Sequence, residues 1–344
     1  MCQTAYQGSP RVKSDFVSLR GRLKAAALVV LLSLGAAAAA APFDVQGHRG
    51  ARGLAPENTL TAFRTALDLG VTTLELDVGL TRDGHVVIAH DRRLNADITR
   101  DASGEWLAVA GPALHTLNTL TLTELQRHDV GRIRPGTRYA QTFPDQRGTD
   151  HEPMPTLDAL FALVRSRGDE RVRFNIETKL SPLAPEETAS PEALVRALLT
   201  VVAKNGMQAR VTVQSFDWRT LKLSQQLAPA IPTVALTVRQ NFLDNLGDER
   251  WTAGLRLADH GGSVPRLVQA AGARVWSPYH LELSQALVAD AQALGLTVIP
   301  WTVNAPEQID RYIGWGVDGI ISDYPDRVLQ LLKKRGRTAG TAAQ

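Results

Sequence analysis

Apolar and polar residues alternate in a regular way from about Val45 to the end of the chain. Apolar runs of roughly four to eight residues, typical of strands, are separated by stretches in which apolar residues recur every three or four positions, as on one helix face. In the first such stretch, Leu60, Phe63 and Leu67 share a face. Eight strand-then-helix units follow one another, with strands beginning near residues 45, 73, 173, 211, 233, 274, 297 and 319.

This alternation predicts an α/β fold class. Strands that alternate with helices form a parallel sheet, because each helix carries the chain back to the edge where the next strand begins. Eight such units close a (β/α)8 TIM barrel. A doubly wound open sheet is the alternative, but no GxGxxG motif follows the first strand, which disfavours its dinucleotide-binding form.

Two segments do not follow the alternation. The stretch between the second and third units is too long for an ordinary loop and contains one helical signal, TLTELQRHDVG. We therefore expect an insertion, residues 91–155, after the second strand unit. The C-terminal residues 335–344 lack apolar periodicity and are predicted to be disordered. The barrel domain then spans residues 42–334.

Residues 1–41 are typical of a secretory signal peptide. Five basic residues and one acidic residue precede an apolar, mostly alanine stretch from Ala25 to Ala41. We expect cleavage near Ala41, export to the periplasm, or secretion as the alternative, and no stable membrane insertion afterwards. An uncleaved anchor is the other interpretation, although the stretch is at the short end of what a spanning helix needs.

The charge of the chain is concentrated in this leader. The formal net charge is +3, but residues 42–344 hold 33 basic and 34 acidic residues. A nearly neutral body gives no reason to expect nucleic-acid binding. The only cysteine is Cys2, so the body forms no internal disulfide.

Three carboxylates fall at the ends of predicted strands, where barrels carry their active sites. Glu75 and Asp77 lie two apart on the second strand and therefore face the same way, and Glu177 ends the third. Three inward carboxylates repel one another unless a cation compensates them. Oxygen ligands suit Ca²⁺ or Mg²⁺, so we predict one divalent metal ion. The alternative is that each carboxylate forms a salt bridge with Arg49 or Lys179.

Two histidines also end runs beside these carboxylates. His48 ends the first strand and His90 closes the apolar run after the second. Imidazole titrates near neutrality, so such a pair is suited to general acid and base catalysis. His85 lies in the turn RDGH and is expected to be exposed, and nothing in the sequence brings the other five histidines to the site.

Cationic and aromatic residues complete the candidate pocket. Arg49 and Lys179 are expected to contact a phosphate, since a guanidinium grips two oxygens at once. Trp301 ends the seventh strand and is a candidate to stack on an alcohol group. Phe216 and Gln214 of the VQSF run have a candidate role in the pocket too. Plain packing is the alternative for all three of these residues.

Taken together, these segments resemble the glycerophosphodiester phosphodiesterase family. The resemblance extends from about Gly47 to Pro325 and rests on a specific combination of motifs. The matching segments are GHRGARGLAPENTLTAF (47–63), ELDVGLTRDGHVVIAHD (75–91), NIETK (175–179), QSF (214–216), WTVN (301–304) and DGIISDYP (318–325).

The resemblance implies a (β/α)8 barrel, one Ca²⁺ or Mg²⁺ ion, and hydrolysis of a small-molecule glycerophosphodiester to sn-glycerol 3-phosphate and an alcohol. The family's functional residues match positions in this chain one by one. The metal ligands match Glu75, Asp77 and Glu177, the catalytic histidines match His48 and His90, the phosphate-contacting cations match Arg49 and Lys179, and a residue that braces the site matches Glu57.

Two other functions remain open on the same barrel. A phospholipase-type phosphodiesterase needs an apolar rim for membrane docking, and the insertion offers few apolar residues for one. A non-catalytic surface-binding barrel is disfavoured because both histidines and all three carboxylates are present. The sequence leaves open which alcohol is released, which metal is used and the oligomeric state.

Overall fold

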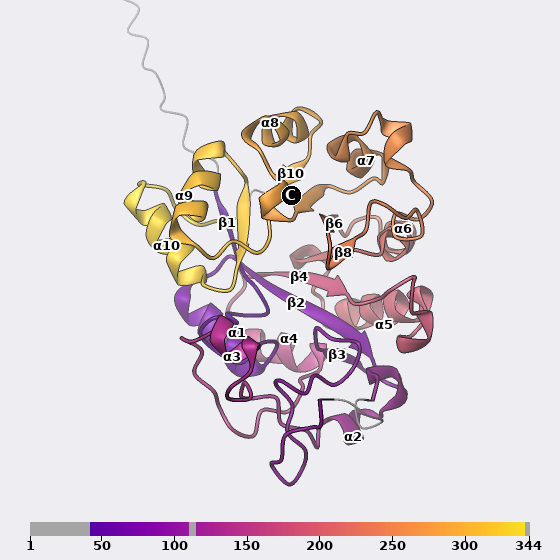
Figure 1. The fold of residues 1–344 in the computed structure, drawn as a ribbon, viewed down its shortest axis with the longest axis vertical. Helices are drawn as coiled ribbons and strands as arrows, with labels where there is room; N and C mark the ends of the chain where they lie inside the picture. The colour runs from indigo at the N-terminus through magenta and orange to yellow at the C-terminus, as the bar shows by residue number, and fades with distance from the viewer. Residues whose placement is uncertain (1–41, 110–114, 341–344) are drawn as a thin grey trace, which may run out of the picture. The chain divides into compact units, whose positions relative to one another are not determined.

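The computed structural model describes residues 42–109 and 115–340. Eight parallel strands form a nearly closed barrel (Figure 1), as the sequence predicts. Around the barrel the strands follow the order β10, β9, β6, β5, β4, β2, β1, β11. Their bounds are β1 (Asp44–Gly47), β2 (Thr73–Leu80), β4 (Arg173–Thr178), β5 (Val211–Ser215), β6 (Thr233–Thr237), β9 (Val275–Pro278), β10 (Thr297–Val298) and β11 (Gly319–Ser322).

Backbone hydrogen bonds beyond the short strand β10 close the ring. Asp318 N–H donates to Val298 O at 3.0 Å, Ile321 N–H to Pro300 O at 3.0 Å, and Val303 N–H to Ile321 O at 3.0 Å. The eight predicted strands are therefore confirmed as the strands of a barrel.

Helices alternate with the strands along the chain and surround the barrel (Figure 1). The first illustrates how local sequence sets their ends. The Thr59 side chain accepts the Ala62 N–H at its start, and Gly70 ends it with a φ of 85°, which glycine adopts without strain. The helices are α1 (Leu60–Leu69), α4 (Leu157–Ser166), α5 (Pro191–Lys204), α6 (Trp218–Leu227), α7 (Val264–Ala270), α8 (Gln285–Ala293), α9 (Pro306–Trp315) and α10 (Pro325–Lys334).

Alternation along each strand separates the core from the site. On β2 and β4, Leu74, Leu76, Phe174 and Ile176 belong to the main hydrophobic core, and each is completely buried. Phe174 packs edge-on against Phe161 of α4, with ring centroids 4.9 Å apart. The residues between them on each strand point to the opposite face, into the barrel. The apolar half of the pattern thus fixes which way the polar half points.

The insertion at residues 91–155 has a small core of its own. It contains the short helices α2 (Leu122–Leu125) and α3 (Arg138–Thr142) and the 3₁₀ turn η1 (Leu117–Thr119). Before it, β3 (Val86–Ile88) pairs antiparallel with β2. Buried apolar side chains hold the segment to β3: Val87, Ala89, Leu94, Ala96, Leu107, Leu117, Leu125, Val130 and Met154.

The helical signal in this insertion produces one turn of helix only. Thr121 and Glu124 form a reciprocal capping box at its start. The chain then leaves the helix because Asp129 accepts the backbone N–H groups of Gly131, His151 and Glu152, which ties it to the end of the insertion.

The remaining elements are short and lie in the loops. The hairpin of β7 (Arg239–Gln240) and β8 (Leu243–Asp244) follows β6. The other 3₁₀ turns are η2 (Pro185–Glu187), η3 (Gln208–Arg210), η4 (Leu257–His260) and η5 (His280–Glu282). No helix among the described residues has the length and apolar character that a bilayer crossing requires.

The C-terminal tail differs from the predicted disorder over its described part. Ala339 pairs with Phe43 as a parallel bridge, and Gly340 N–H donates to Phe43 O at 3.0 Å. The Arg337 guanidinium lies 5.1 Å from the centre of the Phe43 ring, which is completely buried. These contacts order the tail although it lacks apolar periodicity. The leader, residues 1–41, and residues 341–344 lie outside the described part of the chain.

Candidate active site

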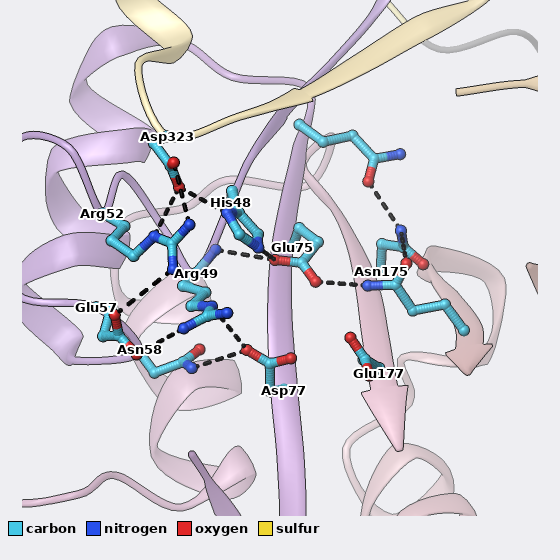
Figure 2. Close-up of polar contacts among 12 residues, drawn as sticks. His48, Arg49, Arg52, Glu57, Asn58, Glu75, Asp77, Asn175, Glu177 and Asp323 are labelled. Atoms are coloured by element: carbon cyan, nitrogen blue, oxygen red, sulfur yellow. Dashed lines mark hydrogen bonds and ion pairs between the residues drawn. The ribbon is translucent and has the colours of Figure 1, made fainter. Parts of the chain in front are cut away.

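Three buried carboxylates converge inside the barrel (Figure 2). Glu75 and Asp77 come from β2, Glu177 comes from β4, and the parallel register sets Asp77 beside Glu177. One oxygen from each lies within 4.8 Å of the others, and the three residues are 2%, 1% and 6% exposed. The structure thus brings together the three carboxylates that the strand positions predicted.

Burial and neighbouring charges shift the pKa values of these carboxylates in different directions. Burial raises the pKa of Glu75 well above its usual range and that of Glu177 to about 7. Burial alone would also raise the pKa of Asp77, but Lys179, His90 and Arg49 hold it below its usual range. Asp77 Oδ1 is buried and accepts no hydrogen bond. A hard divalent cation matches this set of oxygen donors and would bind to Asp77 Oδ1.

Two cations lie beside the carboxylates. Lys179 Nζ is 2.8 Å from Glu177 Oε1 and 3.6 Å from Asp77 Oδ1. Arg49 Nη1 donates to Glu57 Oε1 at 2.8 Å, which braces the guanidinium, and Arg49 Nε lies 3.4 Å from Asp77 Oδ2. Asp77 and Glu177 thus form the salt bridges considered from the sequence, whereas Glu75 accepts the backbone N–H of Arg49 instead. Both cations line the pocket together with Glu75 and Glu177.

His48 is oriented by a carboxylate from the last strand unit (Figure 2). Its Nδ1 lies 2.6 Å from Asp323 Oδ1, and its Nε2 lies 3.9 Å from Glu75 Oε2. Burial, with the positive charge of Arg52, lowers the pKa of His48 to about 4. At neutral pH the imidazole is uncharged, with Nδ1 held by Asp323 and Nε2 on the side of Glu75.

His90 has a similar arrangement on the insertion side. Its Nδ1 lies 2.8 Å from Asp91 Oδ1, and Asn95 Nδ2 donates to Asp91 Oδ2 at 2.7 Å. Burial and the charge of Arg49 lower the pKa of His90. Its side chain keeps 31% exposure, against 11% for His48, so His90 is the more open of the two histidines.

The pocket is lined by both polar and apolar side chains. It encloses about 460 Å³, part of which is open to solvent, and its polar lining includes both histidines, Arg49, Lys179, Glu75, Glu177 and Gln214. Its apolar lining consists of Phe216, Leu236, Trp301 and Ile321, and Lys179 Nζ lies 5.8 Å from the centre of the Phe216 ring. The rings of Phe216 and Trp301 meet edge to face at 5.2 Å, so the predicted aromatic residues do reach the pocket.

Further aromatic residues lie between Trp301 and the protein surface. Tyr279 lies 5.3 Å from Trp301 and 5.7 Å from Phe242, centroid to centroid, and Phe242 in the β7–β8 hairpin is 65% exposed. The loop after β6 thus provides exposed apolar surface near the pocket, separate from the insertion.

Sequence reasoning missed two residues that act beside His48, Asp323 and Arg52. Asp323 holds His48, accepts from Arg52 Nε at 2.8 Å and accepts from Asn304 Nδ2 at 2.7 Å. Arg52 lines the pocket itself. The signal for Asp323 was its place after the eighth strand, next to the first strand in a closed barrel. Gln214, predicted to support the site, donates through Nε2 to Glu75 Oε1.

Comparison with known proteins assigns the family. The profile of the glycerophosphoryl diester phosphodiesterase family matches residues 48–327. The chain belongs to that family. It is therefore an enzyme of the phosphodiester hydrolase class, and the match runs from His48, just after β1, to the first turn of α10.

Relatives match over nearly their full length. A glycerophosphodiester phosphodiesterase of Caldanaerobacter subterraneus is 29% identical over 293 residues, covering 85% of this chain and 98% of the relative. A solved structure from Silicibacter pomeroyi, whose description carries the family name, is 36% identical, with a TM-score of 0.77 over 87% of this chain and 96% of that one.

A third relative shares the fold at lower identity. It is an Oleispira antarctica phosphodiesterase solved in complex with the product sn-glycerol-3-phosphate. It is 22% identical, with a TM-score of 0.62 over 85% of this chain and 97% of that one.

Proposed function

We propose that this enzyme hydrolyses glycerophosphodiesters to sn-glycerol 3-phosphate and an alcohol, with one divalent metal ion at Glu75, Asp77 and Glu177. The observation that carries the proposal is the convergence of these buried carboxylates beside a pocket that Arg49 and Lys179 line together with Glu75 and Glu177. Carboxylates supply the oxygen ligands that Ca²⁺ and Mg²⁺ prefer. The two cations supply the donors that a phosphate anion needs. The family assignment agrees with this chemistry.

The metal would act on the phosphoryl group as a Lewis acid. Protein side chains then orient the diester around it. Lys179 and Arg49 are each bridged to a carboxylate yet line the pocket, so they are held in place before substrate arrives. Such preorganised charges cost little reorganisation when negative charge develops on the phosphoryl oxygens.

We propose that His48 and His90 are the general acid and base. Both are held through Nδ1 by a carboxylate, and both pKa values lie below the ordinary value, so both rings begin uncharged at neutral pH. An uncharged imidazole is competent to take a proton from the nucleophile, either a glycerol hydroxyl or water. The anionic diester favours protonation of the other ring, which then protonates the leaving alcohol.

Phe216 and Trp301 would contact the organic part of the substrate, since they are the aromatic residues that line the pocket beside the phosphate-binding residues. Cleavage of a phospholipid is the second candidate function. The observation that favours it is the row of aromatic side chains from Trp301 through Tyr279 to the exposed Phe242. Lipid-anchored substrates would meet that row, whereas glycerophosphodiesters would fit within the pocket.

Product analysis tests the proposal. Purified enzyme is given glycerophosphocholine, glycerophosphoethanolamine and glycerophosphoinositol, and separately a phosphatidylcholine vesicle. We expect release of sn-glycerol 3-phosphate from the three soluble diesters and little turnover of the vesicle. Preferred cleavage of the vesicle lipid would favour the phospholipase-type function, and no turnover of any substrate would favour a binding protein.

A further inference from the structure

A chain of buried amide side chains crosses the barrel interior and ends at one of the proposed metal ligands. Gln46 on β1 and Asn175 on β4 are 3% and 1% exposed, and Gln214 on β5 is 1% exposed. Their hydrogen bonds connect Asp44, at the start of β1, with Glu75 on β2. The proposed chemistry uses neither Gln46 nor Asn175.

Asn175 is the centre of this chain. Its Nδ2 donates to Gln46 Oε1 at 2.9 Å and to Gln214 Oε1 at 3.0 Å, and its Oδ1 accepts from Thr212 Oγ1 at 2.8 Å. An amide nitrogen has two protons, so both are used. The register of the sheet sets up the contacts, since Asn175 lies level with Glu75 on one side and with Thr212 on the other.

These bonds determine which way each glutamine faces. Because its oxygen meets Asn175, Gln214 turns its Nε2 toward Glu75 Oε1, and Gln46 likewise turns its Nε2 to Asp44 Oδ2 at 2.8 Å. The reverse orientation of Gln214 would set its carbonyl oxygen against the Glu75 carboxylate and its amide protons against those of Asn175. Both contacts are unfavourable where no water compensates them.

The Glu75 carboxylate is consequently held from two sides. Gln214 donates to Oε1, and the Arg49 backbone N–H donates to Oε2 at 2.9 Å. Two donors on two oxygens fix the plane of the carboxylate. The remaining lone pairs are then aimed without further rearrangement, which is how groups outside the ligand set tune metal affinity.

We infer that Asn175 is a positioning residue for the metal ion, acting through Gln214 on Glu75. The inference rests on the metal site proposed above. It adds that a residue outside the ligand set controls the affinity for the cation by setting the orientation of another side chain.

The test is an Asn175→Asp variant of the mature protein, titrated with Ca²⁺ and with Mg²⁺ alone by calorimetry. An ionised carboxylate accepts hydrogen bonds and donates none, so Gln214 would turn its Nε2 to position 175 and present its oxygen to Glu75. We expect metal affinity to fall by about 10–100-fold, the usual range for such outer residues. Saturating metal should restore much of kcat, although the affinity for the metal stays reduced. KM should change little.

Thr212→Val is the matched control. It removes one hydrogen bond from the same buried cluster but leaves both Asn175 N–H donors, so metal affinity should stay within about twofold while Tm falls. If Asn175→Asp does not fold, Asn175→Leu removes both donors without adding charge and should weaken metal binding equally.

Three results would overturn the inference. Unchanged metal affinity in the folded Asn175 variant would show that the residue does not position Glu75. Equal weakening in Thr212→Val would show a general effect of core damage. A wild-type protein that binds neither cation would remove the metal site itself, and the inference with it.

Discussion

The two histidines of the site share one geometry, in which a carboxylate holds Nδ1 and the other ring nitrogen is left for the pocket. His48→Ala and His90→Ala should each lower kcat by about 10²–10⁴-fold, the usual range for a positioned proton-transfer group. Metal affinity measured by calorimetry should be unchanged, because neither ring belongs to the proposed ligand set. Near-normal turnover in either variant would remove that histidine from the mechanism.

A substrate with a good leaving group separates the two roles. A nitrophenyl ester needs little help from a general acid, so it should restore turnover in the variant that lacks the acid and leave the other variant impaired. Equal restoration of both variants would contradict the division of roles.

Asp323 should be required through its hold on His48. In Asp323→Asn, the His48 ring loses the charge that favours its protonated form and its tautomer is no longer fixed, so kcat should fall by about 10²-fold or more. The measurement is kcat against KM, with calorimetry to check that the metal still binds. A loss confined to KM would mean that Asp323 acts on substrate binding through Arg52 instead.

At this scale, the sequence predicted residues whose role depends on their own strand and missed those whose role depends on the pairing of the first and last strands. Glu75 and Asp77 were found because a spacing of two sets both on one face of a strand. Asp323 and Arg52 were not assigned, because their pairing brings together residues 271 positions apart and follows only from closure of the barrel.

At the scale of elements, the eight strand positions were predictable because each strand is a short apolar run with flanking turn residues. The insertion was expected at residues 91–155, but its internal structure was not predictable, since its small core uses apolar residues scattered without a period. Its helical signal extends beyond the one turn that forms, because the side chain of Asp129 draws the chain away to pair with residues near 151. The described residues of the tail, 335–340, differ from the prediction for a related reason: backbone pairing with Phe43 leaves no periodic pattern.

The connection between β9 and α8 holds a buried histidine that should make the fold sensitive to acid. Burial lowers the pKa of His280 to about 4, below the ordinary 6.5, so the folded state keeps the ring uncharged. Below pH 6.5 the unfolded chain takes up a proton that the folded chain does not. The contribution to stability is therefore complete above pH 6.5 and is lost as the pH falls through 4, by roughly 1–3 kcal/mol.

The variant His280→Gln has no titrating group at this position. Denaturant unfolding at pH 7.5 and pH 4.5 should show a smaller loss of stability in the variant than in the wild type. Parallel losses in both proteins would show that His280 does not contribute to the acid sensitivity.

At the scale of the whole molecule, the contacts of Phe43 limit where the leader can be cleaved. Phe43 is completely buried and bonds to the C-terminal tail, so it belongs to the folded barrel. We propose that the leader is removed near Ala41, which leaves Phe43 in place. N-terminal sequencing of the exported protein should find a start near Ala41 in the soluble fraction. An intact leader in the membrane fraction would contradict this proposal.

The central claim is that hydrolysis depends on one divalent cation held by Glu75, Asp77 and Glu177. The most direct measurement follows sn-glycerol 3-phosphate release from glycerophosphocholine by enzyme stripped with EDTA, before and after Ca²⁺ or Mg²⁺ is restored. We predict that stripping abolishes turnover, that one of the two cations restores it, and that Asp77→Ala is not restored by either. Full activity of the stripped wild-type enzyme, with no metal detected in it, would contradict the claim.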